Sequence, residues 1–475
     1  MSSSRSTDPS GLPGRSRARR TPAGADVPPQ TRVCVVTLGC PKNAVDSEQM
    51  LALLAARGFA LELCPEEADA VIVNTCAFIE EAQRESIEEI LGLARLKGEG
   101  RLRHLIVAGC LAERHREELF REIPEVDGLV GPGSVGQAAE VLSGLVAGEQ
   151  RLARVGAFGP IPADAPRVRT GAPHTAYLKL AEGCNHRCAF CLIPRLRGPL
   201  RSRPLDSIVA EAESLAAEGV REVILVAQDT TAYGRDLPGR PTLADLLARL
   251  ETCAGPEWVR LMYAHPLRWD VAIEERLAAG GRLLPYLDLP IQHIADPVLR
   301  AMRRGHGGRL LRNLVRRLRR RIPGLVLRTT VLTGHPGEGP REFEELLGFL
   351  REFPFDRLGA FAYSPEIDSP ASGSAPSTSR SEAEERRDRV LKLQRDLAVR
   401  IQAARVGRRL DVLIEGVRTD RDYAVGRSYG EAPEIDGNVH IRHARASAGR
   451  GVEPGEFLRA RIVGAGPYDL VGVPE

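Results

Sequence analysis

The sequence predicts an α/β protein in three parts: a Rossmann-like domain with a parallel sheet, a full or partial βα barrel of the TIM type, and a small all-β barrel. Short apolar, β-branched runs alternate with helical patterns over residues 31–147 and again over 174–400. Such alternation is typical of parallel sheets. Residues 401–475 instead hold short strand-like runs between Gly and Pro, as small barrels do.

The two α/β series are separated by a Pro- and Gly-rich stretch, residues 148–173, which we interpret as a linker. Residues 1–30 are rich in Ser, Pro, Gly and Arg and have little to bury, so we expect a disordered extension. The arginines of this extension are either solvated or contact RNA or an acidic surface.

Composition restricts the class of protein. A chain of 475 residues that is 43% hydrophobic and 27% charged is expected to be soluble and to form sizeable cores. It shows no membrane span and no signal peptide, which predicts a cytoplasmic protein with no membrane partner. In that reducing compartment its nine cysteines are expected to be ligands or redox groups rather than disulfides. The net charge is only +3, and we attribute the excess of 62 Arg over 4 Lys to base composition rather than to nucleic-acid binding.

Three cysteines of the first domain, Cys40, Cys76 and Cys110, each stand at or just past the end of a predicted strand. Because the carboxyl ends of parallel strands meet at one edge, the three thiols are expected to converge on a single site. We predict an iron–sulfur cluster there with one open iron; the alternative is three buried thiols in an Ala-rich core. Cys34, Cys64 and Cys253 are expected to be structural. The elements predicted around the trio are strands at Arg32–Leu38, Ala70–Val73 and Leu105–Val107 and helices at Asp46–Arg57 and Ile79–Leu96.

The second domain begins with a cysteine loop, Cys184-Asn185-His186-Arg187-Cys188-Ala189-Phe190-Cys191. Three thiolates at this spacing hold three irons of a cubane cluster and leave the fourth iron without a protein ligand. A zinc site would need a partner pair that is missing nearby, and His186 is expected to order the loop rather than to bind metal. The spacing, with an aromatic residue before the last cysteine, resembles the radical S-adenosylmethionine (SAM) superfamily.

Functional groups are expected at the carboxyl ends of the barrel strands, where Gln228, Asp229, Gln292, His293 and Gly334–Glu338 stand. Each is alternatively an ordinary strand-end turn, and the role of His293 as an acid or base stays open. The strands expected here are Ala176–Leu180, Val223–Val226, Trp258–Tyr263, Tyr286–Leu289, Leu325–Val331 and Leu358–Ala362, with a helix at Ser207–Glu218.

The flanks of the first three cysteines carry a family resemblance. Thr37-Leu38-Gly39-Cys40-Pro41-Lys42-Asn43, Asn74-Thr75-Cys76-Ala77-Phe78-Ile79 and Ala108-Gly109-Cys110-Leu111 resemble the amino-terminal domain of the methylthiotransferases. Leu38 and Lys42 are similar to the branch that modifies ribosomal small-subunit protein twelve; the tRNA-modifying branch usually has Tyr and Met there. The resemblance runs from about residue 31 to the end of the chain, and the last domain resembles a TRAM barrel, a module used for substrate recognition.

The resemblance implies that a β-methylthio group is installed on an aspartate of that ribosomal protein. It implies two 4Fe-4S clusters, one on Cys184, Cys188 and Cys191 and an auxiliary one on Cys40, Cys76 and Cys110. SAM serves as radical source and as methyl donor, and a flavodoxin or ferredoxin as electron donor, while the sulfur donor is unassigned. It places Gln228 and Asp229 at the methionine part of SAM, Arg328 among the SAM contacts and Phe190 near the adenine. The two clusters would carry the chemistry, with no side-chain acid or base.

Three other functions remain: a tRNA (adenosine) methylthiotransferase, a radical-SAM enzyme whose second cluster only carries electrons, and a non-catalytic iron–sulfur binding protein. Two charge patterns bear on them. The predicted helix Arg303–Arg321 holds nine arginines and no acid, so its face either meets RNA or is simply solvated. Residues 405–475 hold 11 arginines, no lysine and 11 acids, which favours a protein partner, with Glu431, Glu434 and Asp436 predicted to meet a basic surface.

A capping box is predicted at Ser381–Glu384, where it would begin the helix that leads to the last domain.

Overall fold

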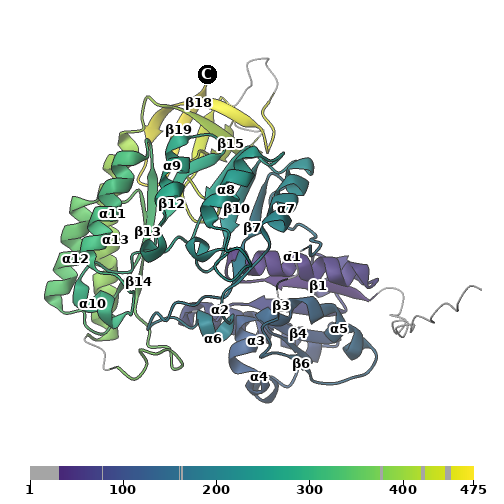
Figure 1. The fold of residues 1–475 in the computed structure, drawn as a ribbon. Helices are drawn as coiled ribbons and strands as arrows, with labels where there is room; N and C mark the ends of the chain where they lie inside the picture. Colours follow the sequence, from purple (N-terminus) through teal and green to yellow (C-terminus); the bar gives the residue numbers. More distant parts are fainter. Residues whose placement is uncertain are drawn as a thin grey trace, which may run out of the picture.

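The computed structural model describes residues 31–475 except 78, 160, 162–163, 375–377, 419–422 and 444–450. The predicted extension at residues 1–30 and Phe78 therefore lie outside the described residues. The described chain forms two parallel sheets and one closed barrel, which confirms the predicted fold class. Figure 1 shows the first domain at one end of the molecule, the barrel at the other end and the second sheet between them.

The first domain is a sheet of six parallel strands in the order β2-β1-β3-β4-β5-β6. Successive strand residues face opposite sides, so Val71 and Val73 pack against the α2 and α3 side while Ile72 packs against the α1 and α5 side. The sheet is thereby buried on both faces, as βαβ crossovers require. Its elements are β1 (Arg32–Thr37), α1 (Pro41–Ala56), β2 (Ala60–Glu62), β3 (Ala70–Thr75), α2 (Glu80–Gly98), β4 (His104–Gly109), α3 (Cys110–His115), α4 (Glu117–Glu122), β5 (Gly128–Val130), α5 (Ala138–Val146) and β6 (Leu152–Arg154).

Two predictions in this domain were wrong in detail. The supposed linker contains β6, which pairs in parallel with β5 and completes the sheet. Three residues are too few to give a strand signal in the sequence. Helix α1 begins at Pro41 rather than Asp46, because a proline fits the first turn of a helix and Cys40 serves as the N-cap.

The second domain is an open sheet of six parallel strands, β14-β13-β12-β11-β10-β7, whose outer face packs on helices to form the largest core. The two edge strands, β7 and β14, do not pair, so the barrel is partial. Its strands are β7 (Thr175–Lys179), β10 (Glu222–Val226), β11 (Trp258–Leu261), β12 (Leu283–Asp288), β13 (Val326–Thr333) and β14 (Arg357–Ala362), and β8 (Ala181–Glu182) and β9 (Arg201–Ser202) form a small antiparallel pair. Its helices are α6 (Ile193–Leu196), α7 (Leu205–Ala217), α8 (Leu243–Thr252), α9 (Val271–Ala279), α10 (Asp296–Ala301), α11 (Gly308–Arg321), α12 (Pro340–Glu352) and α13 (Arg380–Ala403).

Two helix starts differ from the prediction. Helix α11 begins at Gly308, because the chain before it turns through Arg303 and Gly305, which both have positive φ. The cap of α13 is Ser379, whose hydroxyl accepts a hydrogen bond from the backbone N–H of Glu382. The predicted capping box was therefore placed two residues too late.

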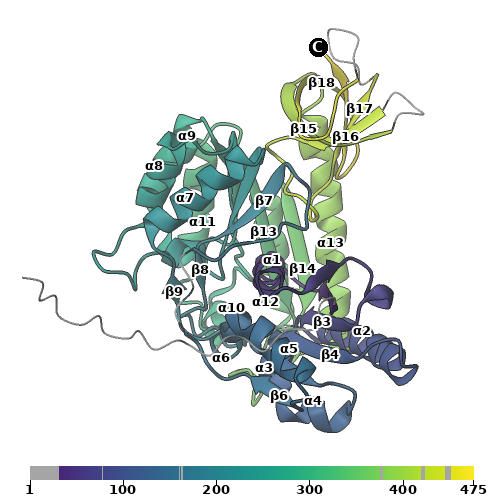
Figure 2. The ribbon, with the colours of Figure 1, turned by 90° about the vertical axis from the view of Figure 1, so that its right-hand side faces the viewer.

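The last domain is a closed five-stranded barrel in the order β15-β16-β17-β19-β18, as predicted. It docks on the amino-terminal ends of the second domain's strands, for example through Arg427 and Glu222. Figure 2 shows α13 running up to it from the side of the second sheet. Its strands are β15 (Arg409–Arg418), β16 (Tyr423–Arg427), β17 (Val439–Arg442), β18 (Phe457–Ala465) and β19 (Leu470–Pro474).

Candidate iron–sulfur and SAM site

The first cysteine trio lies at one edge of the first sheet. Cys40 follows β1, Cys76 follows β3 and Cys110 follows β4, and these three strands are neighbours in the sheet. Cys110 is close enough to Cys76 and Cys40 for their charges to act on its thiol. The structure thus brings the three residues together as expected, and their binding of a cluster stays a prediction.

Two glycines bring these loops close. Gly39 and Gly109 have φ of +94° and +88°, and each directly precedes a cysteine of the trio. A Cβ on Gly39 would lie 2.6 Å from the Cβ of Cys76, and one on Gly109 would lie 2.5 Å from the carbonyl oxygen of Thr75. Only glycine fits both the backbone conformation and the space. The Gly-Cys pairs in the sequence therefore reflect the close approach of the loops.

Buried amides hold the loops in register. The Asn43 side chain donates to the carbonyls of Leu38 and Thr75 at 2.8 and 3.0 Å, and Asn74 donates to the carbonyl of Asn43 at 2.9 Å. The Ser86 hydroxyl accepts from the N–H of Cys76 and donates to its carbonyl. Sequence reasoning missed Ser86, because a serine in a charged helix carries no signal of its own.

Cationic side chains flank this trio. Burial tends to raise the pKa of the Cys40 thiol, but the Lys42 ammonium and the Arg197 guanidinium outweigh it, so the net shift is downward. Burial raises the pKa of Cys110 to about 11, although Arg197 donates a hydrogen bond to it. Cluster binding deprotonates each thiol, and nearby cations favour the thiolate form.

The second trio lies in the loop after β8. The N–H of Cys184 donates to the carbonyl of Gly198 at 3.1 Å, and that of Cys191 to the carbonyl of Cys188 at 3.1 Å. The Arg304 guanidinium donates to the Cys188 sulfur at 3.5 Å. Burial raises the pKa of Cys184 to about 11 and that of Cys191 to about 12. Arg304 therefore lies beside Cys188 and acts on Cys191, while Arg268 acts on Cys184.

His186 orders this loop, in keeping with the prediction. Its Nε2 lies 2.7 Å from the carboxylate of Asp229, and its ring stacks on that of His265 with centroids 4.0 Å apart. The other carboxylate oxygen of Asp229 accepts from the N–H and the hydroxyl of Thr231 at 3.0 and 2.5 Å. Both oxygens of Asp229 are thus engaged with protein groups.

A buried charge network joins the loops that carry the two trios. Arg197, six residues past Cys191, donates to Asn43 at 2.5 Å, to Asp46 at 3.2 Å and to Glu182 at 2.8 Å. Lys179 pairs with Asp46 and, at 3.0 Å, with Glu182. Figure 1 shows the common element, α1, lying between the first sheet and β7. No feature of the sequence alone indicated this network.

A cavity of about 560 Å³ opens beside the second trio. Phe190 from the cysteine loop lines it together with Ile79 and Glu81 of the first domain. Both domains therefore contribute to its wall. The rest of its lining comes largely from the carboxyl-terminal parts of β13 and β14, the segment after β14 and α13: Thr330, Leu332, Ala360, Phe361, Ala362, Tyr363, Ser364, Glu366, Arg380, Glu384, Arg387 and Leu391.

Of the four residues predicted to contact SAM, only Phe190 lines this cavity. The Gln228 amide donates to Glu182 at 2.5 Å, so it belongs to the charge network. Arg328 lies on the third residue of β13 and pairs with Asp288 at 3.2 Å and with Asp436 at 3.8 Å. The SAM contacts of Gln228, Asp229 and Arg328 stay predictions, and each side chain already has protein partners.

Gln292 is a lining residue that the sequence marked only as a strand end. Its φ is +66°, which is uncommon for any residue other than glycine. Its N–H donates to the carbonyl of Thr330 and its carbonyl accepts from the N–H of Leu332, which fixes the strained backbone. Strain held in this way clusters at functional sites, and here it occurs in a residue that lines the cavity.

His293, beside Gln292, is fully buried, and in the described structure its Nε2 makes no hydrogen bond. Its Nδ1 accepts from the N–H of Ala295 at 3.0 Å, and its Nε2 lies 3.3 Å from the buried carboxylate of Glu338. Arg386 pairs with the same carboxylate at 2.8 Å. Of the two interpretations left open by the sequence, this geometry favours the structural one.

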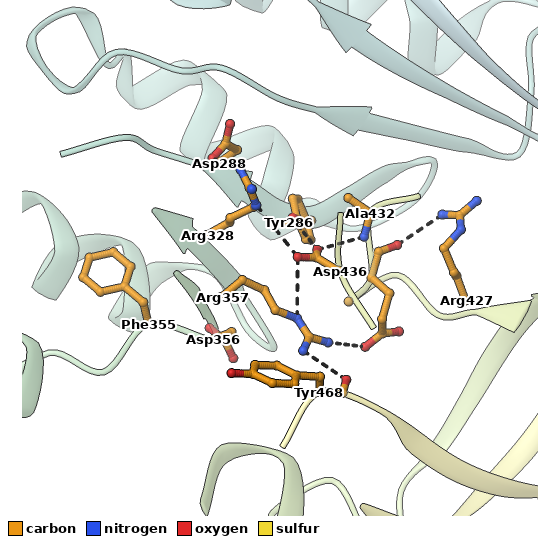
Figure 3. A network of polar contacts seen from close by, with 12 residues as sticks. Tyr286, Asp288, Arg328, Phe355, Asp356, Arg357, Arg427, Ala432, Asp436 and Tyr468 are labelled. Atoms are coloured by element: carbon orange, nitrogen blue, oxygen red, sulfur yellow. Dashed lines mark hydrogen bonds and ion pairs between the residues drawn. The ribbon is translucent and has the colours of Figure 1, made fainter. Parts of the chain in front are cut away.

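Two of the three acids predicted to meet a basic partner, Glu431 and Asp436, instead face arginine and tyrosine side chains of this chain, whereas Glu434 is exposed. Glu431 is fully buried and pairs with Arg357 and Arg405 at 2.9 Å each. Asp436 accepts from the Tyr286 hydroxyl at 2.6 Å and lies near Arg328 and Arg357 (Figure 3). Glu434 accepts from the hydroxyl of Tyr177. These acids hold the barrel onto the second domain through partners that the sequence pattern does not reveal.

The arginine-rich helix α11 is largely neutralised by its neighbours. Arg317 and Arg321 pair with Glu274, and Arg312 pairs with Glu345 and Glu352. Arg319 pairs with Asp356 at 2.7 Å. The helix therefore presents less free positive charge than its sequence suggests, which weakens the interpretation of this face as an RNA-binding surface.

A cubane cluster and a single metal ion need their cysteine ligands at different spacings. The cysteines of the two trios form no disulfide. In the described part of the chain, no three His, Cys, Asp or Glu side chains are close enough together to hold one metal ion. A cubane takes each thiolate on a different iron, so its ligands stand further apart than those of zinc, which binds sulfur at about 2.3 Å. No helix within the described ranges is long and apolar enough to cross a membrane.

The fold and the cysteine loop define the class of protein as a radical SAM enzyme. Residues 178–350 match the Radical SAM superfamily, residues 32–131 match Uncharacterized protein family UPF0004, and residues 406–474 match the TRAM domain. The solved structure of the radical SAM methyltransferase TsrM from Kitasatospora setae has a TM-score of 0.53 and 18% identity, and the match covers 72% of this chain and 74% of that one. This likeness shows the fold alone.

The chain belongs to the family of the ribosomal protein uS12 methylthiotransferases RimO. It is 47% identical over 441 residues to the RimO of Desulforudis audaxviator, a match that covers 93% of this chain and 96% of that protein. It is also 47% identical over 443 residues to the RimO of Anaeromyxobacter sp. strain K, covering 93% of both chains. The resemblance drawn from the cysteine motifs is thereby confirmed.

Proposed function

We propose that this protein transfers a methylthio group to the β carbon of an aspartate in ribosomal protein uS12. The observation that carries the proposal is the buried charge network that joins the loops of the two cysteine trios, which come from two domains. Residues of both domains also line the cavity at Phe190. Cys184, Cys188 and Cys191 would hold one 4Fe-4S cluster, and Cys40, Cys76 and Cys110 a second. When bound, the first cluster with SAM supplies a 5′-deoxyadenosyl radical and the second supplies the sulfur.

The chain's own residues position and shield this chemistry. Arg197, Lys179 and Asp46 fix the first domain against the mouth of the partial barrel. Phe190, Leu332 and other apolar side chains cover the cavity wall and limit the access of water. The reaction is a radical hydrogen abstraction, which needs no acid or base, and the buried His293 is accordingly engaged elsewhere.

We further propose that the enzyme works in the cytoplasm with a flavodoxin or ferredoxin as electron donor. The sulfur donor is left unassigned. A tRNA-modifying enzyme would share all six cysteines, so the distribution of charge on the protein must distinguish the two functions. Residues 405–475 are balanced at 11 arginines and 11 acids, and the arginines of α11 are largely paired, which supports a protein substrate.

The test is mass spectrometry of uS12 and of digested tRNA from cells with and without this gene. The proposal expects the methylthio mass on the uS12 aspartate to disappear with the gene while tRNA is unchanged. Loss of methylthiolated adenosine with intact uS12 modification would assign the enzyme to tRNA. A change in neither would favour a non-catalytic iron–sulfur protein.

A further inference from the structure

Lysine is rare in this chain, and its placement is selective. Of 66 basic residues only four are lysines: Lys42, Lys97, Lys179 and Lys392. Lys97 pairs with Asp127 at the surface of the first domain, and Lys392 is exposed on α13. Lys42 and Lys179 are both buried where the first two domains meet. The contact between the first two domains therefore holds two of the chain's four lysines, whereas nearly all of its other basic residues are arginines.

Only one of these two ammonium groups is matched by carboxylates. Lys179 and Arg197 share the carboxylates of Asp46 and Glu182, two positive charges against two negative ones. Within the described residues, Lys42 has no carboxylate within 4.0 Å. The domain contact thus carries one buried cation that has no carboxylate partner and whose charge acts on the Cys40 thiol.

The surroundings of Lys42 are unusual for a cation. Its side chain is 8% exposed, and its Nζ lies 3.6 Å from the centroid of the Tyr263 ring. A cation–π contact offsets only part of the cost of removing an ammonium ion from water. The N-terminus of α1, where Lys42 lies, adds partial positive charge. Both features would favour an anion beside Nζ.

Tyr263 is itself held in a strained conformation. Its φ is +59°, which is an uncommon and strained backbone conformation for a residue other than glycine. Its N–H donates to the Asp288 carboxylate at 3.1 Å, and its carbonyl accepts from the N–H of Thr230 at 3.1 Å. The surrounding structure thus forces the ring into its place under the ammonium, at the carboxyl end of β11, where barrel enzymes gather functional groups.

We propose that the Lys42 ammonium receives the carboxylate of the substrate aspartate. The inference rests on the proposed function, in which the reacting carbon adjoins that carboxylate. Lys42 stands two residues past Cys40, so a carboxylate bound to Nζ would hold the neighbouring carbon beside the auxiliary cysteines. The same ammonium would favour an aspartate over an uncharged asparagine at the target position. A buried cation is stabilised more by an ionised carboxylate than by a neutral amide.

The experiment measures capture of uS12 by the cluster-loaded full-length protein under anaerobic conditions. Two versions of uS12 are used, one with the target aspartate and one with that aspartate replaced by asparagine. Wild type is expected to bind the aspartate version about tenfold or more tightly. Lys42→Met is expected to lose this preference, Lys42→Arg to keep part of it, and the exposed Lys392→Met to behave as wild type. Iron content and SAM cleavage without substrate are measured on every variant.

An aspartate preference that persists in Lys42→Met would overturn the inference. A second result would also overturn the inference: Lys42→Met shifts the reduction potential of the auxiliary cluster but keeps the preference for the aspartate version of uS12. The ammonium would then act on the cluster alone. Wild-type protein that captures uS12 without preferring aspartate overturns only the role of Lys42. Wild-type protein that neither captures nor modifies uS12 overturns the proposed function itself.

Discussion

The guanidinium of Arg197 lies 3.2 Å from the carboxylate of Asp46, across the contact between the first two domains. Both side chains are almost fully buried, at 1% and 3% exposure. Each residue stands six positions after a cysteine, Arg197 after Cys191 and Asp46 after Cys40. The pair therefore fixes the distance between the two cysteine loops as well as the packing of the domains.

Replacing Arg197 by methionine is expected to destabilise this contact. Asp46 and Glu182 would keep only Lys179 as a charged partner, and removing one member of a buried ion pair costs about 3–5 kcal/mol. Denaturant unfolding of the protein without clusters should show a lower midpoint. The matched control is Arg195→Met on the same loop, whose guanidinium is 58% exposed and pairs with Asp368 at the surface. Equal midpoints for the two variants would contradict the assigned role of Arg197.

Much of the site was predictable because it follows from strand ends. Cys40, Cys76 and Cys110 could be placed together from the strand pattern alone, since parallel strands share an edge. Arg197 and Asp46 could not, because their contact spans 151 positions and depends on how two domains pack. The local sequence pattern carries no information on contacts between residues so far apart in the chain.

Charge was a misleading guide for the same reason. Glu431 and Asp436 looked like surface acids in a Gly-rich segment, yet they pair with Arg357 and Arg328 on the barrel strands. The arginines of α11 looked like a free basic face, yet their partners Glu274 and Glu352 come from other helices. Net charge read from the sequence counts ions, and the fold decides which of them remain free.

Alanine at Gly39 or Gly109 is expected to prevent binding of the auxiliary cluster. A Cβ at either position would meet Cys76 or Thr75 within 2.6 Å, which would spread the loops that carry the thiols. Iron per reconstituted chain should fall from about eight to about four. Gly58→Ala is the control: its φ is +88°, but nothing lies within 4 Å of the added carbon, so it should cost about 1 kcal/mol of stability and keep the iron. Full iron content in Gly39→Ala and Gly109→Ala would refute this role of the glycines.

The two cysteine trios are expected to be separable. Replacing Cys184, Cys188 and Cys191 by alanine should abolish SAM cleavage and leave about four irons per chain. Replacing Cys40, Cys76 and Cys110 should also leave about four irons and spare SAM cleavage, yet stop methylthiolation. Measured by iron analysis and by release of 5′-deoxyadenosine, this pattern distinguishes two clusters from one. Product formation by the second variant would rule out a sulfur role for the auxiliary site.

The docking of the last barrel is expected to weaken in acid, and Glu431 gives the sign. Burial tends to raise the pKa of this carboxyl, but Arg405 and Arg357 outweigh it and the net shift is downward. Because the pKa is lower in the folded protein, the ionised Glu431 carboxylate contributes its full stabilisation above the unfolded-state pKa of about 4.5. This stabilisation is lost as the pH falls below that value. Glu431→Gln should therefore lower the unfolding midpoint at pH 7 by the equivalent of about 3 kcal/mol, and the difference from wild type should shrink below pH 4.5. Glu453→Gln, at an exposed position of the same domain, should behave as wild type at every pH. A Glu431→Gln deficit that stays constant from pH 7 to pH 3.5 would show that packing, rather than the charge of Glu431, holds the barrel in place.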